Sequence, residues 1–352
     1  FYLLIFLLVL IVSSTTNKLL PFLPMPLIQI LLGIGIGLCL PNNQYHLDTE
    51  LFLALVIGPL LFREAQEADI TSILKHWRIV LYLIFPVIFI SALSMGGVAH
   101  VLWASLPLAA CVAVGAALGP TDLVAFASLS QRFSFPKRVS NILKGEGLLN
   151  DASGLVAFRM ALIAWTTGTF SLTQAGTSLA ISIVGGFAVG FITALINRFL
   201  HTFLLSVRAT DIASELLLEL SLPLLTFFIA EEIHVSGIIA VVVAGILKAS
   251  RFKKINLLEA QVDTVTETVW QTVTFMLNGS VFVILGMELE MIAEPILKSA
   301  FYNKVLLLLS VFLLTFLLFA IRFVMIYGFY SFRIKKLHKS LDKYVKDMLL
   351  LT

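Results

Sequence analysis

Apolar segments recur along the whole of this 352-residue chain and are separated by short polar stretches. A helix needs roughly 20 apolar residues, each adding about 1.5 Å, to cross about 30 Å of hydrocarbon. The pattern predicts eleven spans, at residues 1–17, 22–40, 51–68, 79–97, 101–130, 139–166, 177–197, 211–231, 236–250, 264–287 and 301–331. The 236–250 segment is short, and the 101–130 segment is long and interrupted at Gly119-Pro120. We therefore expect an all-α polytopic membrane protein.

Charged residues alternate between the loops that join these segments. One set of loops is basic and holds Lys18, Lys75, Arg78, Arg132, Lys137, Arg138, Arg198, Arg208, Lys248, Arg251, Lys253, Lys254, Arg333, Lys335, Lys336 and Lys339. The intervening loops are acidic or uncharged and hold Asp48, Glu50, Glu231, Glu232, Glu288, Glu290, Glu294 and the uncharged stretch 168–176. Because basic loops stay on the cytoplasmic side, we expect a multi-pass protein of the cell membrane whose first span begins outside and whose last residues lie inside.

The composition excludes several classes of function. The chain is 59% hydrophobic and 13% charged, whereas soluble domains are charged at about a quarter of their positions. Its mean hydropathy is +1.01. Cys39 and Cys111 both lie in apolar runs without a CxxC pattern, so neither a metal centre nor a redox site is expected. The net charge of +3 is too small to indicate a nucleic-acid partner, and we expect no cofactor.

A first polar cluster interrupts the long 101–130 segment at Gly119-Pro120-Thr121-Asp122. Pro120 has no N–H and its ring clashes with the preceding turn, so the helix should break there. A broken helix within a membrane is tolerated where its backbone lines a cavity. Asp122 could neutralise a half-helix N-terminus while the carbonyl of Thr121 faces a cation. The simpler interpretation is a structural kink that Asp122 caps.

A second polar cluster runs from Gly145 to Gly154 inside the 139–166 segment. Glu146 and Asn150 are four positions apart and share a helix face, and Asp151 follows directly. Na⁺, like other hard cations, prefers oxygen ligands. Desolvation favours the protonated form of a carboxyl, and a bound cation favours the ionised form. Proton and Na⁺ could therefore compete for Asp151, although a buried acid that only holds helices together has the same pattern.

Three glycines of this second cluster, Gly145, Gly147 and Gly154, allow another helix backbone to approach closely. Arg322 is alone in the 301–331 segment and needs an acidic partner at membrane depth. Glu146 is the first candidate for this structural ion pair and Glu64 is the second. Glu215 and Glu219 could line a cytoplasmic vestibule, but an ordinary interfacial helix face has the same spacing.

At these two clusters the sequence resembles the NhaP/NHE-type monovalent cation:proton antiporters, the sodium/hydrogen exchangers. Gly119 to Asp122 resembles the Thr-Asp-Pro break of that family, and Gly145 to Asp151 resembles its Gly-Glu-Ser-Leu-Leu-Asn-Asp motif. Supporting matches occur in family order, at Leu23-Pro24-Met25-Pro26 with the glycines 33, 35 and 37, Pro59-Leu60-Leu61-Phe62, His234-Val235-Ser236-Gly237-Ile238 and Phe282-Val283-Ile284-Leu285-Gly286. Two departures are Leu123, where the family has Pro, and Gly147, where it has Ser.

The resemblance implies a homodimer with an NhaA-like inverted-repeat fold, a broken crossing helix and thirteen spans. The eleven counted here would fit a chain cut two spans early, and its start inside an apolar run at Phe1 suggests a missing beginning. The implied regions are 1–97, N-terminal spans of the dimerisation domain with the start of the core; 98–170, core ion-binding spans; 171–260, second-repeat spans on the dimerisation side; and 261–352, later core spans with a basic cytoplasmic linker.

The resemblance also implies electroneutral, elevator-type exchange of Na⁺, or K⁺ or Li⁺, for H⁺, with a role in pH homeostasis. Asp151 would bind the Na⁺ ion, Thr121 and Asp122 would shape the site, and Asn150 and Glu146 would support it. A proton-coupled carrier for an organic solute on the same fold is the main alternative, and a cation channel is another. An intramembrane enzyme using Glu146 and Asp151 as acid and base lacks supporting motifs, so we expect no enzyme.

Overall fold

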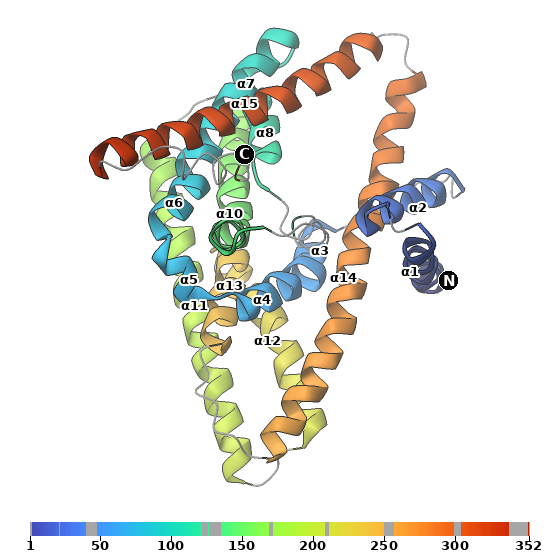
Figure 1. Ribbon diagram of the computed structural model, residues 1–352, viewed down its shortest axis with the longest axis vertical. Helices are drawn as coiled ribbons and strands as arrows, with labels where there is room; N and C mark the ends of the chain where they lie inside the picture. The colour runs from blue at the N-terminus through green and yellow to red at the C-terminus, as the bar shows by residue number, and fades with distance from the viewer. Residues whose placement is uncertain are drawn as a thin grey trace. The chain divides into compact units, whose positions relative to one another are not determined.

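The computed structural model describes residues 2–20, 22–39, 48–121, 126, 135–168, 172–207, 211–249, 257–298, 304–337 and 351, and every regular element in these ranges is a helix (Figure 1). The helices are α1 (Tyr2–Leu19), α2 (Met25–Cys39), α3 (Thr49–Phe52), the π-helical turn η1 (Leu53–Ile57), α4 (Gly58–Glu67), α5 (Ile70–Lys75), α6 (Trp77–Tyr82), the π-helical turn η2 (Leu83–Val87), α7 (Ile88–Leu102), α8 (Leu108–Leu118), α10 (Lys137–Thr167), α11 (Leu172–Ser206), α12 (Ile212–Glu232), α13 (Gly237–Ala249), α14 (Leu257–Lys298) and α15 (Lys304–Leu337). The all-α class is confirmed over the described ranges.

Ten of the predicted spans coincide with apolar helices. Within the part of the chain that the structure describes, six helices are long and apolar enough to cross a membrane: Trp77–Leu102, Lys137–Thr167, Ala180–Leu204, Ile212–Glu232, Thr264–Ala293 and Lys304–Ser331. Four more are apolar but shorter, at Ile5–Leu19, Met25–Cys39, Leu108–Leu118 and Gly237–Ala249. The remaining predicted span, 51–68, corresponds to α3, η1 and α4 together. The chain is therefore polytopic, and the numbers eleven and thirteen stay predictions.

The predicted start of the 101–130 segment was wrong. α7 continues to Leu102, and α8 begins only at Leu108, directly after Pro107. A proline fits the first turn of a helix because its missing N–H would have no helical partner there, whereas it disrupts a helix interior. Pro107 therefore marks the start of α8, a boundary that hydropathy alone does not reveal because the residues before and after it are apolar.

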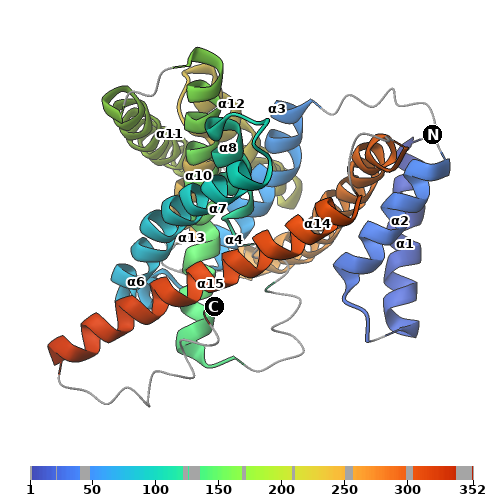
Figure 2. The same cartoon turned by 90° about the horizontal axis from the view of Figure 1, so that it is seen from above.

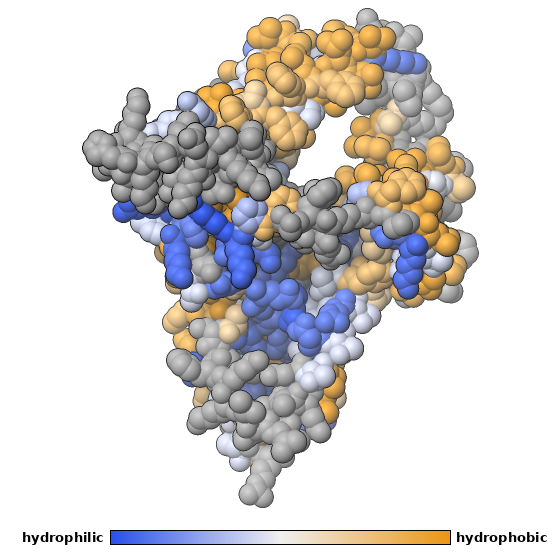
Figure 3. All heavy atoms as spheres, viewed as in Figure 1, coloured by the Kyte–Doolittle hydropathy of each residue, from blue (hydrophilic) through white to orange (hydrophobic). Residues whose placement is uncertain are grey.

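The helices form two compact units. Unit 1 comprises residues 1–67 and 181–300, and unit 2 comprises residues 68–180 and 301–352. The predicted assignment of regions to a dimerisation domain and a core domain stays a prediction. Within both units, apolar side chains cover much of the exposed helix surface (Figure 3), as side chains facing lipid would. On α15, for example, Leu308, Phe312 and Phe316 are each at least 60% exposed.

Close helix packing in unit 1 depends on glycine. α2 lies against α14 (Figure 2), and a Cβ on Gly33 would come within 2.2 Å of the Val283 carbonyl oxygen. A Cβ on Gly286 would likewise lie 2.2 Å from the carbonyl oxygen of Ile30. Small residues at such crossings let helix backbones approach closely, which favours association inside a membrane. Gly33 and Gly286, two of the glycines singled out in the sequence, thus each pack against the other's helix, whereas a Cβ on Gly35 would meet nothing within 4 Å.

Unit 2 is built on the same principle and places the two polar clusters together. A Cβ on Gly115 of α8 would lie 2.4 Å from the Ala92 carbonyl oxygen of α7, and one on Gly96 would lie 2.6 Å from the Cα atom of Val112. α10 also packs along α8. Ala92, Ala116 and Ala157, from α7, α8 and α10 respectively, form one small buried cluster. The end of α8 is thereby held against the middle of α10.

Candidate ion-binding site

The helix break lies where the proline predicts it. α8 ends at Leu118, Gly119 caps it, and the chain continues without helical structure through Thr121. The residues that follow, including Asp122 and Leu123, lie outside the described residues. Pro120 packs directly on α10, because a Cβ placed on Gly154 would lie 2.3 Å from Cγ of its ring. The Pro120 end of the helix break is thus packed against α10.

One stripe of α10 faces this break. Glu146, Asn150 and Gly154 follow one another at intervals of four residues, so they lie one above the other on the same helix face. Each of the three meets the break: Glu146 through the Thr121 hydroxyl, Asn150 through Thr121, and Gly154 through Pro120. The (i, i+4) spacing noted in the sequence for Glu146 and Asn150 therefore places both side chains against Thr121.

Asn150 ties the break to α10. Its side-chain Nδ2 donates to the backbone carbonyl of Thr121 over 2.9 Å and to the Thr121 hydroxyl oxygen over 2.7 Å. The residue is 0% exposed, and its Oδ1 atom is buried with no hydrogen-bond donor among the described residues. A buried acceptor without a donor costs about 1–3 kcal/mol. A cation or a water molecule beside Oδ1 would offset that cost.

Glu146 and Arg322 form a buried ion pair. Both Arg322 terminal nitrogens reach the carboxylate, with Nη1 and Nη2 each 2.7 Å from a different Glu146 oxygen. Glu146 is 1% exposed and Arg322 is 7% exposed. Two parallel N–H···O bonds of this kind are the strongest arrangement for an arginine and a carboxylate. The charge of Glu146 is therefore neutralised within the site.

The third guanidinium nitrogen of Arg322 is also hydrogen-bonded. Its Nε donates to the backbone carbonyl of Leu351 over 2.8 Å. Leu351 is itself buried in an apolar cluster with Ile142 of α10 and with Ile326 and Tyr330 of α15. The guanidinium is thus held from two sides, which fixes its orientation toward Glu146. Glu64, the second candidate partner, belongs to α4 in unit 1, whereas Arg322 belongs to unit 2.

Asp151 occupies the α10 position next to Asn150, but its side chain lies outside the described residues. Gly147, one turn before it, is buried. Unit 2 thus brings Thr121, Glu146, Asn150 and Arg322 into direct contact and carries the Asp151 backbone in the same helix turn as Asn150. The part that each of these residues plays in cation binding stays a prediction.

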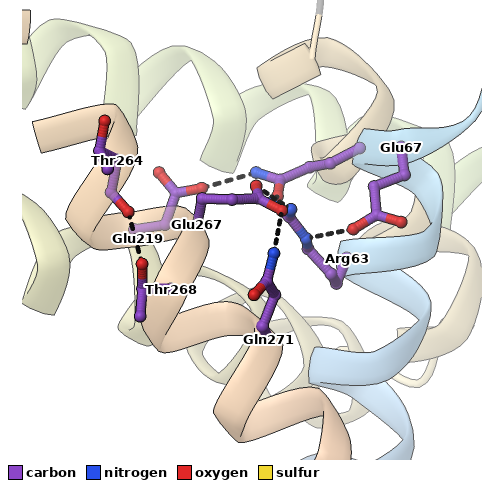
Figure 4. A network of polar contacts seen from close by, with 8 residues as sticks. Arg63, Glu67, Glu219, Thr264, Glu267, Thr268 and Gln271 are labelled. Atoms are coloured by element: carbon purple, nitrogen blue, oxygen red, sulfur yellow. Dashed lines mark hydrogen bonds and ion pairs between the residues drawn. The ribbon is translucent and has the colours of Figure 1, made fainter. Parts of the chain in front are cut away.

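A second polar network, in unit 1, was not predicted from the sequence (Figure 4). Arg63 of α4 pairs with Glu67 over 2.7 Å and with Glu267 of α14. Close by, Lys248 of α13 lies 3.0 Å from Glu219 of α12, whose other carboxylate oxygen accepts from the Gln66 side chain over 2.7 Å. Lys248 also donates to the side-chain Oδ1 atom of Asn197 over 3.0 Å. The network joins helices α4, α11, α12, α13 and α14.

Contacts of this network within a single helix have a signal in the sequence, such as the four-residue spacing of Arg63 and Glu67. The sequence pattern presented Lys248 as a marker of a cytoplasmic loop and Glu219 as a vestibule or interfacial residue. In the structure they pair with each other, and their side chains are only 11% and 14% exposed. Contacts between separate helices carry no local sequence signal, so this cluster required three-dimensional information.

Comparisons with known proteins agree with the resemblance. Residues 3–341 match the family model described as sodium/hydrogen exchanger, transmembrane. A sodium, potassium, lithium and rubidium/H⁺ antiporter of Bacillus pumilus (strain SAFR-032) is 35% identical over 319 residues, which is 91% of this chain and 48% of that protein. The antiporter of the same description from Bacillus subtilis (strain 168) is 35% identical over 329 residues, 93% of this chain and 49% of that protein. The chain thus spans about half the length of these curated relatives.

The solved structures show the same fold. The sodium proton antiporter MjNhaP1 from Methanocaldococcus jannaschii superposes with a TM-score of 0.65 at 18% sequence identity, covering 92% of this chain and 77% of that one. The family match covers nearly the whole chain, and it includes both polar clusters that meet at the end of α8. On this evidence the chain belongs to the sodium/hydrogen exchanger family.

Proposed function

We propose that this chain forms the ion-binding part of a secondary transporter that exchanges Na⁺, or K⁺ or Li⁺, for H⁺ across the cell membrane. Asp151 carries the cation and the proton in turn. The observation that carries this proposal is the pair of hydrogen bonds that the Asn150 side chain donates to Thr121, over 2.9 and 2.7 Å. It concentrates carbonyl, hydroxyl and amide oxygens beside the α10 turn that bears Asp151, and hard cations prefer such ligands.

The ion pair of Glu146 supports Asp151 as the exchanging group. Of the two acids in the Gly145–Gly154 cluster, Glu146 is engaged by both terminal nitrogens of Arg322. Its charge is already balanced by the guanidinium, and both of its oxygens are occupied by that contact, so it is poorly placed to bind a transported cation. Asp151 is then the acid left to alternate between H⁺ and Na⁺. One such carboxyl gives one cation for one proton, which makes the exchange electroneutral.

The neighbouring oxygens complete the proposed site. One lone pair of the Thr121 carbonyl is used by Asn150, so a cation would meet the other. The Oδ1 atom of Asn150 is buried without a donor among the described residues and is a further candidate ligand. Gly147 adds no oxygen beyond its backbone carbonyl, so the site draws its side-chain ligands from Asn150, Asp151 and Thr121. Asp122 joins them by resemblance.

Alternating access would follow from movement of one unit against the other. The helices divide into two compact units, and the proposed site is built entirely within unit 2. A site held in one body can be exposed to either side of the membrane by an elevator-type displacement of that body. We further propose a homodimer in which unit 1 supplies the static interface. The separate packing of the two units supports this division of roles.

The proposal is tested by exchange in vesicles. The purified protein is reconstituted with an imposed pH gradient, and Na⁺, K⁺ or Li⁺ is added while the fluorescence of a pH-sensitive dye is followed. We expect dequenching with wild type, none with Asp151→Asn, and normal exchange with Glu232→Gln, which removes an exposed carboxylate at the end of α12. Exchange by Asp151→Asn at the wild-type rate would show that Asp151 is structural. No response of wild type to any cation would refute the proposed function.

A further inference from the structure

Gly154 holds the helix break in place through the ring of Pro120. A Cβ at Gly154 would lie 2.3 Å from Cγ and 3.1 Å from Cδ of Pro120, and 3.4 Å from the Ala116 carbonyl oxygen. Carbon atoms in contact lie about 3.5–4.0 Å apart. An alanine here would therefore push α10 and the break apart by about 1 Å. The proline ring is closed onto the backbone and cannot swing aside as a flexible side chain could.

The position is unfavourable for glycine unless the close approach is needed. Gly154 lies inside the 31-residue helix α10, where alanine is a better helix former than glycine. Alanine would thus be preferred on local grounds. What the glycine provides is the contact with Pro120, the residue that precedes Thr121 in the chain. The seating of Pro120 therefore sets the distance between Thr121 and α10.

We propose that Gly154 is a positioning residue that selects the size of the transported cation by fixing the spacing between Thr121 and α10. This inference rests on the proposed function and deepens it. Asn150 lies one turn before Gly154 and binds both oxygens of Thr121, while Glu146 lies one turn further back and also meets the Thr121 hydroxyl, at 3.5 Å. A displacement at Gly154 therefore acts directly on Thr121.

Selection by size follows from how oxygen sites discriminate between cations. Selectivity between hard cations depends on cavity size, the number of ligands and the rigidity of the site. A short distance between Thr121 and α10 makes a site that suits small cations, and a longer distance makes one that suits larger cations. The Gly154→Ala variant should therefore lose affinity for Li⁺ and Na⁺ more than for K⁺. A purely structural glycine would lower stability without changing this ratio.

The test compares Gly154→Ala with Gly97→Ala in the reconstituted protein. Gly97 lies in α7 of the same unit, and a Cβ there would meet nothing within 4 Å. The readout is the concentration of Li⁺, Na⁺ and K⁺ that gives half-maximal exchange. A ten-fold rise in this concentration corresponds to a loss of about 1.4 kcal/mol of cation binding, and we expect the Na⁺ and Li⁺ values to rise by about this factor or more. The K⁺ value should change less, and Gly97→Ala should behave as wild type.

A second variant makes the outcome independent of folding. In Pro120→Ala the ring atoms that Gly154 accommodates are absent, so adding Gly154→Ala to it should leave the Na⁺ to K⁺ ratio unchanged. The inference is overturned if the Na⁺ to K⁺ ratio of the double variant differs from that of Pro120→Ala alone. It is also overturned if Gly154→Ala alone keeps the wild-type ratio. In either case, exchange by the wild type would still support the proposed function. Absence of cation-dependent exchange in wild type would instead refute both.

Discussion

The amide nitrogen of Asn150 donates to both oxygens of Thr121, the carbonyl over 2.9 Å and the hydroxyl over 2.7 Å. A single side chain thereby links the middle of α10 to the backbone released by the break after α8. Inside a membrane there is no bulk water to satisfy such backbone groups, so a broken helix needs a partner of this kind. The link explains how an interrupted helix and an intact one can share a stable polar site.

Replacing Asn150 by alanine should destabilise the protein and abolish its exchange activity. Both oxygens of Thr121 would lose a donor, and a buried acceptor left unsatisfied costs about 1–3 kcal/mol. The measurements are the unfolding midpoint in detergent and cation-dependent exchange in vesicles. Ser153→Ala is the matched control, since the Ser153 hydroxyl donates to the backbone carbonyl of Asn150 in its own helix, over 2.8 Å. Exchange that survives in Asn150→Ala would contradict the role given to this link.

Breaking the Glu146–Arg322 pair from one side should be more harmful than removing it entirely. A buried charge without its partner is destabilised by about 3–5 kcal/mol, whereas apolar replacement of both members of a pair is often tolerated. We therefore expect Glu146→Leu and Arg322→Leu each to lower the unfolding midpoint strongly.

The double variant Glu146→Leu/Arg322→Leu should recover much of that loss. A double-mutant cycle on the unfolding free energy measures the coupling between the two residues. Additive effects would show that the pair contributes nothing as a unit. Swapping the two side chains, in the double variant Glu146→Arg/Arg322→Glu, should not restore stability. The carboxylate introduced at position 322 cannot donate to the Leu351 carbonyl.

Two of the ion pairs in unit 1, Arg63–Glu267 and Lys248–Glu219, should respond differently to substitution and to salt. Glu267 is 50% exposed, so its pair with Arg63 should contribute only about 0.2–1 kcal/mol and weaken in high salt. Glu219 and Lys248 are 14% and 11% exposed and share further hydrogen bonds with Gln66 and Asn197. Unfolding midpoints of Glu267→Gln and Glu219→Gln at low and high salt test this. Equal losses, or a larger salt effect for Glu219→Gln, would contradict the burial argument.

The positions of the helices and the local chemistry of the site could be predicted from the sequence better than the contacts between helices could. Hydropathy located the apolar helices because a membrane span is a long one-dimensional signal, and Pro120 located the end of α8 because its missing N–H acts locally. The pairing of Arg322 with Glu146 was the first choice on the ground that a charge at membrane depth needs a partner, and this ion pair is observed. Pro107 was overlooked as a helix start because hydropathy does not register it.

The remaining features depend on which helices are neighbours. The seat of Pro120 on Gly154 and the contacts of Lys248 with Glu219 and Asn197 join segments far apart in the chain, so no periodicity indicates them. The glycine-rich pattern did indicate close packing, but not that Gly154 meets a proline ring. Asp151 remains a prediction from chemistry and resemblance, supported by the neighbours that the structure gives to Asn150.

The central claim is that one carboxyl, Asp151, holds either a proton or a cation, and proton release on cation binding tests it most directly. Calorimetric titration of the purified protein with Na⁺ in two buffers of different ionisation enthalpy gives the number of protons released per cation bound. At a pH low enough that the cation-free carboxyl is protonated, and high enough that Na⁺ still displaces the proton, we expect close to one proton per Na⁺ for wild type and none for Asp151→Asn. Na⁺ binding without proton release in wild type, or equal release in Asp151→Asn, would contradict it.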